Sequence, residues 1–498
     1  MKKNLCLLLL LLLSIQLPAQ FTLSGAIRGY SGKTPVSVNT PVVYGFHQEN
    51  TVDIPVNASG QFNIILPVTG QQFVSLIYQR KFYTLLLTAG KELVIALDEK
   101  NKTLRLLSGD ALQENLLLQQ IDMDSPPFFW ENGTFDRLSL EELQKKLIDP
   151  FFSIQNEHFK TISAADISER DKKLIASEVK YLGYNYLSDF GRTRIDDRDI
   201  LNNFVFAIFD PCVIDPEFVP AGPQYYAFAD NYLRYLETKA FVKIKKENIT
   251  PDKPIPYYGI SLDSANVLVK KYGKPYWRFV GSLNNFPPDV AEKYNFQQVQ
   301  DQYYARDLAQ VKGLAEAFKK QFPQSPYNKD ISRMMNELGE KLAANQHNRN
   351  IVVVKDYDKV QSIYEVVKTL KGKVVYLDIW GTWCGPCKEE IKQLPGLKAA
   401  FADKDVAYIY LAMDDDDRDA LWKDYIKVNN MEGVHLRKTR QTIAPFWKEL
   451  LADHPDKAEY YPQYFLFDKT GKLVVSKAKR PSEKEALYEQ INALLKGN

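Results

Sequence analysis

The stretch of residues 373–392, which reads KVVYLDIWGTWCGPCKEEIK, constrains the fold of this chain more than any other part of its sequence. Residues 374–380 are apolar and rich in β-branched side chains apart from one acid, Asp378, and such a run predicts a fully buried strand. From Lys388 onward, apolar residues recur at the spacing of a helix. Cys384 and Cys387 are therefore expected where a strand gives way to the first turn of a helix.

This position favours ionisation of a thiol. The unpaired N–H groups and the dipole at the start of a helix stabilise a negative charge, and the thiolate is the attacking species in disulfide exchange. The two residues between Cys384 and Cys387 let the cysteines close a small, reducible disulfide ring. Pro386 fixes one backbone angle in that ring and suits the first turn of a helix.

A structural zinc site and a structural disulfide are the two other interpretations of the cysteine pair. A structural zinc site needs four ligands, usually from two such pairs. The sequence has no second C-x-x-C, and its histidines are scattered at positions 47, 158, 347, 435 and 454. A structural disulfide would not need the flanking tryptophan or the buried acid. Redox chemistry at Cys384 and Cys387, with no metal, is therefore the prediction.

These residues together resemble the active site of the thioredoxin family. Asp378, six residues before Cys384, matches the family's buried acid. Cys384 matches the exposed nucleophile, and Cys387 matches the resolving cysteine. Glu390 is similar to an acid found in the TlpA/ResA-type extracytoplasmic thioredoxins. The resemblance covers about the last 150 residues.

A second part of the resemblance lies further along the chain. Pro462, preceded by Tyr461, matches the proline that is cis in this family and faces the redox cysteines. Tyr461 departs from the small or β-branched residue common at that place. Pro462 follows Cys387 by 75 residues, a gap similar to that of the TlpA type, which carries an insertion in the middle of the fold. The resemblance implies a substrate-docking surface made of Trp383, Gly385, Pro386, Tyr461 and Pro462.

Residues 1–20 are typical of a secretory signal. They combine two early lysines, an apolar run at residues 5–13 and a cleavage-like Pro-Ala-Gln at residues 18–20. The apolar run is shorter than the roughly 20 residues that span a bilayer. We therefore expect export to the periplasm or cell envelope, with no stable membrane span after cleavage.

Charge and cysteine content restrict the partners. Without the two lysines of the signal, basic and acidic residues balance at 62 each, which gives no argument for nucleic acid or an anionic membrane. A secreted protein stapled by disulfides would carry more cysteines, in even number. The remaining cysteine, Cys212, is expected to be a buried thiol.

The predicted fold is multidomain. Short apolar runs separated by turn signals predict a small β-sandwich over residues 21–110. Residues 111–345 are expected to form a mainly helical domain, in which Ser139 and Glu142 make a capping box. Residues 351–498 are expected to form the C-terminal α/β thioredoxin-like fold. Ser482 with Glu485 is expected to cap the last helix, and the acidic run 414–417 is expected to open another.

The predicted function is that of a periplasmic thiol–disulfide oxidoreductase. The Gly-Pro dipeptide resembles that of reducing members of the family, and this resemblance implies a reductase. The expected catalytic residues are Cys384, Cys387, Asp378 and Glu390, with no cofactor beyond the redox disulfide. Protein disulfides would be the substrates, and the family implies a membrane thiol relay as electron donor. One alternative is an envelope binding protein whose first 345 residues hold a ligand. A peroxiredoxin frame ending at Cys384 fails, because Leu377 and Gly381 occupy its first two positions.

Overall fold

The computed structural model describes residues 20–68, 70–131, 133–212, 214 and 222–497. The predicted signal lies outside this part of the chain except for Gln20. The chain divides into two compact units, one of residues 1–264 and 278–297 and the other of residues 265–277 and 298–498. The domain limits expected near residues 110 and 345–351 stay predictions.

From residue 20, where its described part begins, the first unit has eight strands: β1 (Gln20–Arg28), β2 (Val36–Asn39), β3 (Thr51–Asp53), β4 (Gln61–Pro67), β5 (Gln71–Tyr78), β6 (Lys81–Thr88), β7 (Glu92–Asp98) and β8 (Thr103–Ser108). They form two four-stranded sheets, in the orders β4-β1-β7-β8 and β3-β2-β5-β6. Leu93 and Ile95 from the first sheet and Val38 and Leu76 from the second belong to one buried cluster. The two sheets therefore share a single apolar core.

In the described part of the first unit, six helices follow these strands before the chain first leaves the unit: α1 (Leu112–Gln120), α2 (Leu140–Leu143), α3 (Asp149–Ala164), α4 (Glu169–Arg194), α5 (Arg198–Phe209) and α6 (Pro223–Glu247). The predicted capping box of Ser139 and Glu142 is confirmed at the start of α2. Tyr225 and Phe228 on α6 are fully buried, and Cys212 is a buried free thiol, as the sequence predicted.

Three helices each span a point at which the chain passes from one unit to the other: α7 (Leu262–Tyr272), α8 (Tyr276–Asn285) and α9 (Pro288–Tyr304). None of the helices within the described residues combines the length and the apolar character needed to cross a membrane.

The second unit holds the remaining elements: α10 (Leu308–Gln321), α11 (Asn328–Asn345), β9 (Ile351–Val353), α12 (Ile363–Val367), β10 (Val374–Trp380), α13 (Gly385–Ile391), α14 (Leu394–Ala400), β11 (Val406–Met413), α15 (Asp419–Val428), β12 (Gly433–Lys438), α16 (Ala444–Leu450), β13 (Gln463–Phe467), β14 (Leu473–Ser476) and α17 (Lys484–Lys496). Its sheet has the order β14-β13-β10-β11-β12-β9. β10 pairs in parallel with β11 and antiparallel with β13. This is the thioredoxin-like arrangement expected for the C-terminal part.

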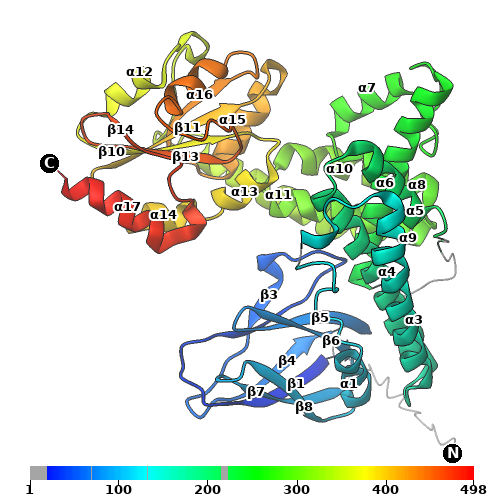
Figure 1. Cartoon of the computed structure of the whole chain (residues 1–498). Helices are drawn as coiled ribbons and strands as arrows, with labels where there is room; N and C mark the ends of the chain where they lie inside the picture. The colour runs from blue at the N-terminus through cyan, green and yellow to red at the C-terminus, as the bar shows by residue number, and fades with distance from the viewer. Residues whose placement is uncertain (1–19, 69, 132, 213, 215–221, 498) are drawn as a thin grey trace, which may run out of the picture. The chain divides into compact units, whose positions relative to one another are not determined.

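Both faces of this sheet are covered, which is why every residue of β10 is buried. Alternate residues point to opposite faces of a strand. Tyr376 and Trp380 pack with α13, α14, α15 and α17, whereas Leu377 and Ile379 pack with α12 and α16. Figure 1 shows α14 and α17 on one side of the sheet and α12 and α16 on the other. Asp378 shares the face of Tyr376 and Trp380, so it points toward the layer that contains the cysteine helix.

The helices α10 and α11 are also part of this unit. The Tyr425 hydroxyl on α15 donates to the carbonyl of Ala305, just before α10, at 3.2 Å. The Asn345 amide at the end of α11 donates to the carbonyl of Lys427 at 2.9 Å. Helices α10 and α11 therefore pack against α15, a helix of the thioredoxin-like fold, although the sequence assigned their residues to a separate helical middle domain.

Candidate active site

The two cysteines lie at the start of α13, as the sequence predicted. Cys384 is the N-cap residue, and its Sγ accepts a hydrogen bond from the backbone N–H of Cys387 at 3.1 Å. The two residues form a disulfide with their Cα atoms 5.3 Å apart. Gly385 and Pro386 form the exposed first turn of the helix. An N–H that points at Cys384 Sγ would stabilise negative charge on that sulfur after reduction.

Both cysteines are buried in the disulfide form. Cys384 is 3% exposed and Cys387 is 1% exposed. The resemblance implied an exposed nucleophile, and the structure corrects this expectation, although Cys384 is the more accessible of the two. The reason is packing, because both residues belong to the apolar cluster that also contains Trp380 and Tyr464.

Trp383 stands at the surface beside the disulfide in a fixed orientation. It is 48% exposed, and its indole Nε1 donates to the carbonyl of Met413 at 2.8 Å. A Cβ atom on Gly381 would lie 2.5 Å from this Nε1 and 2.9 Å from the Met413 oxygen. Gly381 therefore lets the indole fold back over the chain, which the sequence could indicate only as a break after the strand.

Tyr461 and Pro462 lie at the same end of the sheet, immediately before β13. The predicted cis Tyr461–Pro462 peptide bond is confirmed. The Tyr461 ring lies 5.2 Å from the Trp383 ring and 5.5 Å from the Trp447 ring, measured between centroids. The indole of Trp447 donates to the Tyr461 hydroxyl at 3.2 Å. The structure thus brings the sequence-predicted docking residues Trp383 and Tyr461 together and adds Trp447, which the sequence did not suggest.

Asp378 is 2% exposed and lies on the sheet face that carries the cysteine helix. Its cross-strand neighbours are Tyr410 on β11 and Tyr464 on β13. Within the described residues, Oδ1 of Asp378 has no hydrogen-bond partner. Burial, and secondly the charge of Glu390, hold the pKa of Asp378 well above its usual value. A carboxyl with a raised pKa is suited to exchanging a proton with a thiol.

Glu390 is also buried, one turn along α13 from Cys387. Its carboxylate accepts hydrogen bonds from the backbone N–H of Ser482 at 2.9 Å and from the Ser482 hydroxyl at 2.7 Å. The expectation that Ser482 caps the last helix is therefore wrong, because its hydroxyl and N–H are occupied by Glu390. Helix α17 begins at Lys484, after the short 3-10 helix 481–483.

A buried network that the sequence analysis missed supports the loop before Cys384. The Asp414 carboxylate accepts from the backbone N–H of Thr382 at 3.0 Å and from its hydroxyl at 2.6 Å. Arg418 lies 3.3 Å from Asp414 and also donates to the Thr382 hydroxyl at 3.0 Å. Burial raises the pKa of Asp414 despite these bonds. The sequence does place Asp414 directly after a buried strand, where an anchoring role could have been suspected. The acidic run 414–417 fits a helix start equally well, so the role of Asp414 was not predicted.

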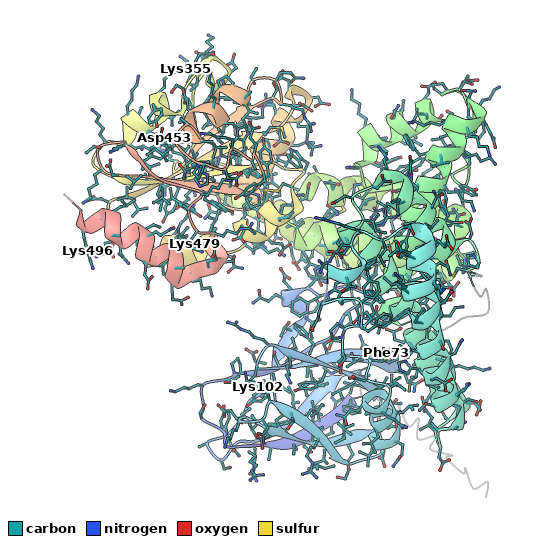
Figure 2. The ribbon with its side chains drawn as sticks, viewed as in Figure 1. Phe73, Lys102, Lys355, Asp453, Lys479 and Lys496 are labelled. Atoms are coloured by element: carbon teal, nitrogen blue, oxygen red, sulfur yellow. A yellow bond between two sulfur atoms is a disulfide. The ribbon has the colours of Figure 1, made fainter. Side chains whose placement is uncertain are left out.

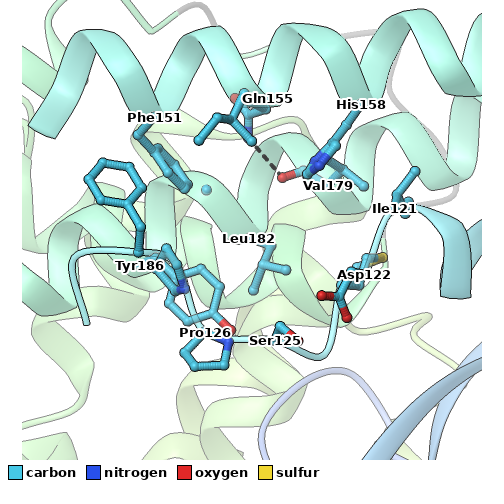
Figure 3. Close-up of a pocket in the computed structure, with 15 residues that line it drawn as sticks. Ile121, Asp122, Ser125, Pro126, Phe151, Gln155, His158, Val179, Leu182 and Tyr186 are labelled. Atoms are coloured by element: carbon cyan, nitrogen blue, oxygen red, sulfur yellow. Dashed lines mark hydrogen bonds between the residues drawn. The ribbon is translucent and has the colours of Figure 1, made fainter. Parts of the chain in front are cut away.

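A cavity of about 250 Å³ lies in the first unit, between α3, α4 and the segment that follows α1 (Figure 3). Its wall is largely apolar and includes Phe151 and Leu182. The polar side chains that line it include Asp122 and His158. None of the described residues that line it is a cysteine. Within the described residues, no group of three or more histidine, cysteine or acidic side chains could hold a metal ion.

Comparisons with known proteins find relatives of part of this chain. Residues 354–491 match the Redoxin family model. Thiol–disulfide oxidoreductase ResA of Bacillus thuringiensis subsp. konkukian is 32% identical over 129 residues, which are 26% of this chain and 67% of that protein. ResA of Bacillus thuringiensis strain Al Hakam is 33% identical over 109 residues, 22% of this chain and 56% of that protein.

A solved structure, the thioredoxin domain of a thiol–disulfide oxidoreductase from Bacteroides vulgatus, is 24% identical. The match covers 26% of this chain and 83% of that one, with a TM-score of 0.21. The family match, at residues 354–491, includes Cys384, Cys387 and Asp378. This chain belongs to the thioredoxin superfamily, among its TlpA/ResA-like thiol–disulfide oxidoreductases.

Proposed function

We propose that this protein is a periplasmic thiol–disulfide oxidoreductase that reduces the disulfides of other proteins through Cys384 and Cys387. The observation that carries the proposal is the disulfide at the N-cap of α13, where the N–H of Cys387 donates to Cys384 Sγ at 3.1 Å. An oriented donor of this kind lowers the energy of a thiolate on the first cysteine.

In the proposed reaction the reduced protein acts first as a nucleophile. The Cys384 thiolate attacks one sulfur of a substrate disulfide, forms a mixed disulfide and expels the other substrate sulfur as a thiolate, which takes up a proton. Cys387 then loses its proton, attacks Cys384 and releases the second substrate thiol. The substrate gains two electrons, and Cys384 and Cys387 return to the disulfide.

Asp378 and Glu390 act on protons and charge in this scheme. Asp378 accepts the proton of Cys387 through a water molecule and returns it when the protein is reduced again. Its raised pKa supports this role, because a base transfers protons most easily when its pKa is near that of its partner. Glu390, held by Ser482, tunes the stability of the thiolate.

The docking surface is formed by Trp383, Gly385, Pro386, Tyr461 and Pro462. Trp383 supports this assignment, since it is 48% exposed yet rigidly held beside the disulfide. Electrons reach the protein from a membrane thiol relay. The signal-like residues 1–20 and the resemblance to extracytoplasmic relatives support export.

Turnover of a fluorescent peptide pair joined by a disulfide tests the proposal, with dithiothreitol as reductant. We expect turnover by the full chain and its loss in Cys384→Ser. Cys212→Ser is the matched control, because Cys212 is a buried free thiol in the first unit. Equal turnover by the wild type and Cys384→Ser would contradict the proposal.

The cavity in the first unit favours a second function, the binding of a small apolar molecule by residues before 265. Its size and its apolar wall suit a compact hydrophobic ligand. Figure 3 shows Gln155 directed toward α4, where its amide donates to the carbonyl of Val179 at 2.9 Å, so this polar side chain is already satisfied.

A solvatochromic naphthalene dye is a suitable probe for this second function. Ile154→Trp would fill the cavity from its rim, since Ile154 lines the cavity and is 45% exposed, and we expect it to abolish dye fluorescence. Ile65→Trp, at a strand residue that is 58% exposed, is the matched control and should leave the fluorescence unchanged. Equal fluorescence in all three proteins would exclude the cavity as the binding site.

A further inference from the structure

A buried ion pair joins the cysteine helix to the start of α10. Lys388 directly follows Cys387, and its Nζ lies 2.8 Å from Oδ2 of Asp307. The two side chains are only 7% and 9% exposed. Breaking such a pair leaves an uncompensated buried charge, which is costly. The position of Lys388 therefore depends on a residue outside the segment 354–491 that matches the Redoxin family.

Asp307 is itself held firmly by its own helix. It is the N-cap residue of α10 and accepts hydrogen bonds from the backbone N–H of Gln310 at 3.2 Å and from the Gln310 amide at 2.9 Å. The preceding turn is fixed as well, because the carbonyl of Ala305 accepts from the Tyr425 hydroxyl at 3.2 Å. Lys388 Nζ lies 5.5 Å from the centre of the Tyr425 ring. The ammonium is thus confined between a fixed carboxylate and an aromatic face.

Lys388 lies in the helix that begins at the cysteine pair. It lies four residues after Cys384, and its backbone N–H donates to the carbonyl of Cys384 at 3.2 Å. A buried charge on the residue next to Cys387 acts on the cysteine pair with little screening by water. A cation there stabilises a thiolate on Cys384, and a carboxylate paired with that cation offsets much of the effect.

Other charged groups surround the pair. Glu389 on the outer side of α13 pairs with Lys392 at 3.1 Å, Glu390 is held by Ser482, and Asp378 lies beneath the helix. Arg306 adjoins Asp307, and its positive charge partly offsets the rise in the pKa of Tyr425 that burial causes. Lys388 and Asp307 are both buried, whereas Glu389 is 67% exposed, so the charge of Lys388 is screened by water less than that of Glu389.

We propose that Asp307 is a positioning residue that sets the redox potential of the Cys384–Cys387 pair by holding and neutralising the ammonium of Lys388. The inference rests on the proposed function of this pair. Reduction of the disulfide takes up two electrons and either one or two protons, according to whether Cys384 ends as a thiolate or a thiol. A free cation beside Cys384 favours the thiolate and hence the reduced form.

Equilibration of the full chain with dithiothreitol buffers measures the potential, and thiolate absorbance measures the pKa of Cys384. We expect Asp307→Asn to raise the potential by about 30 mV, which is a tenfold change in the equilibrium constant, and to lower the pKa of Cys384. Asparagine is a good N-cap residue, so α10 keeps its start. Lys388→Met should shift both quantities in the opposite direction, and the double variant should lie near the wild type.

Glu389→Gln is the matched control, since it removes one negative charge from the exposed side of the same helix, where the Glu389 side chain is 67% exposed. It should leave the potential unchanged. Potentials of Asp307→Asn and Lys388→Met equal to that of the wild type would overturn the inference, as would equal shifts in Asp307→Asn and Glu389→Gln. These outcomes differ from failure of the proposed function, in which the wild type itself would not turn over the peptide disulfide.

Discussion

Asp414, one residue after β11, accepts hydrogen bonds from both the backbone N–H and the hydroxyl of Thr382, two residues before Cys384. The carboxylate is 1% exposed, so these bonds are shielded from water. Arg418 donates to the same hydroxyl and lies beside the same carboxylate. The loop between β10 and α13, which contains Cys384, is therefore anchored to the end of the neighbouring strand β11.

Thr382→Val keeps the shape of the side chain and removes its hydroxyl. We expect the free energy of unfolding to fall by about 1.5 to 3 kcal/mol, because Asp414 and Arg418 both lose a buried partner. Urea unfolding measures the change. Thr470→Val removes a hydroxyl that donates to Asp468 at 2.6 Å on the exposed surface, and it should cost less because water replaces the bond. Equal losses of unfolding free energy in Thr382→Val and Thr470→Val would contradict the claim that the Thr382 hydroxyl makes a buried, stabilising contact.

Gly381→Ala tests the close approach of Trp383. The new Cβ would lie 2.5 Å from the indole nitrogen, so the indole must move and lose its bond to Met413. We expect a loss of about 1 to 3 kcal/mol in unfolding free energy and slower turnover. Gly396→Ala on α14 is the control, because a methyl group there would meet nothing within 4 Å and alanine favours the helix. Unchanged turnover in Gly381→Ala would show that the Trp383 indole is not part of the docking surface.

Asp378→Asn should remove the pH dependence that this carboxyl contributes to stability. The pKa of Asp378 is raised in the folded protein above its ordinary value of 3.8, so the folded state binds this proton more tightly than the unfolded state. Its contribution is complete below pH 3.8 and is lost as the pH rises through the folded pKa. The variant should therefore gain stability relative to the wild type over the pH range above 3.8, until the folded pKa of Asp378 has been passed.

The same substitution should slow disulfide reduction by about 100-fold, since it removes the proposed base for Cys387. Urea unfolding at several pH values and peptide turnover give the two readouts. A constant stability difference across this pH range would show that Asp378 does not titrate differently in the folded state. Full activity in the variant would show that another group takes the proton.

The redox potential of the wild type should lie nearer to about −270 mV, the value of thioredoxin, than to about −120 mV, the value of DsbA. The reason is the Gly385–Pro386 pair between the cysteines, which resembles that of reducing family members. Equilibration with graded ratios of reduced and oxidised glutathione or dithiothreitol measures it. A potential near the oxidising value would make the protein a disulfide donor and contradict the reductase direction.

The sequence predicted features that depend on short stretches of chain. The strand β10 and the helix start at Cys384 follow from a local apolar run and a local break. The burial of Cys212 follows from the general behaviour of free cysteine. The cis bond at Pro462 came from the family resemblance, not from the residues alone.

The contacts that the sequence missed join residues far apart in the chain. Thr382 and Asp414 are 32 residues apart, Lys388 and Asp307 are 81 apart, and Glu390 and Ser482 are 92 apart. Each pair comes into contact only when the sheet and its helices have packed, so no local sequence pattern predicts the contact. Ser482 illustrates the error that follows, because its local pattern fits a helix cap while the fold assigns its hydroxyl to Glu390.

Figure 2 shows how the segment near Lys479 approaches the start of α17. The Tyr376 hydroxyl on β10 donates to the carbonyl of Lys479 at 2.8 Å, and this bond holds the chain that carries Ser482 against the sheet. The position of Glu390 is therefore set by the C-terminal part of the fold as well as by α13.

Capture of the mixed disulfide tests the central claim most directly. Cys387→Ser removes the resolving thiol, so the reduced variant should stop after the first attack and stay covalently joined to a disulfide-bonded peptide. Mass spectrometry should locate the peptide on Cys384, and Cys384→Ser under the same conditions should yield much less adduct. Attachment of the peptide mainly to Cys387 in Cys384→Ser, with none on Cys384 in Cys387→Ser, would reverse the assigned roles and contradict the account.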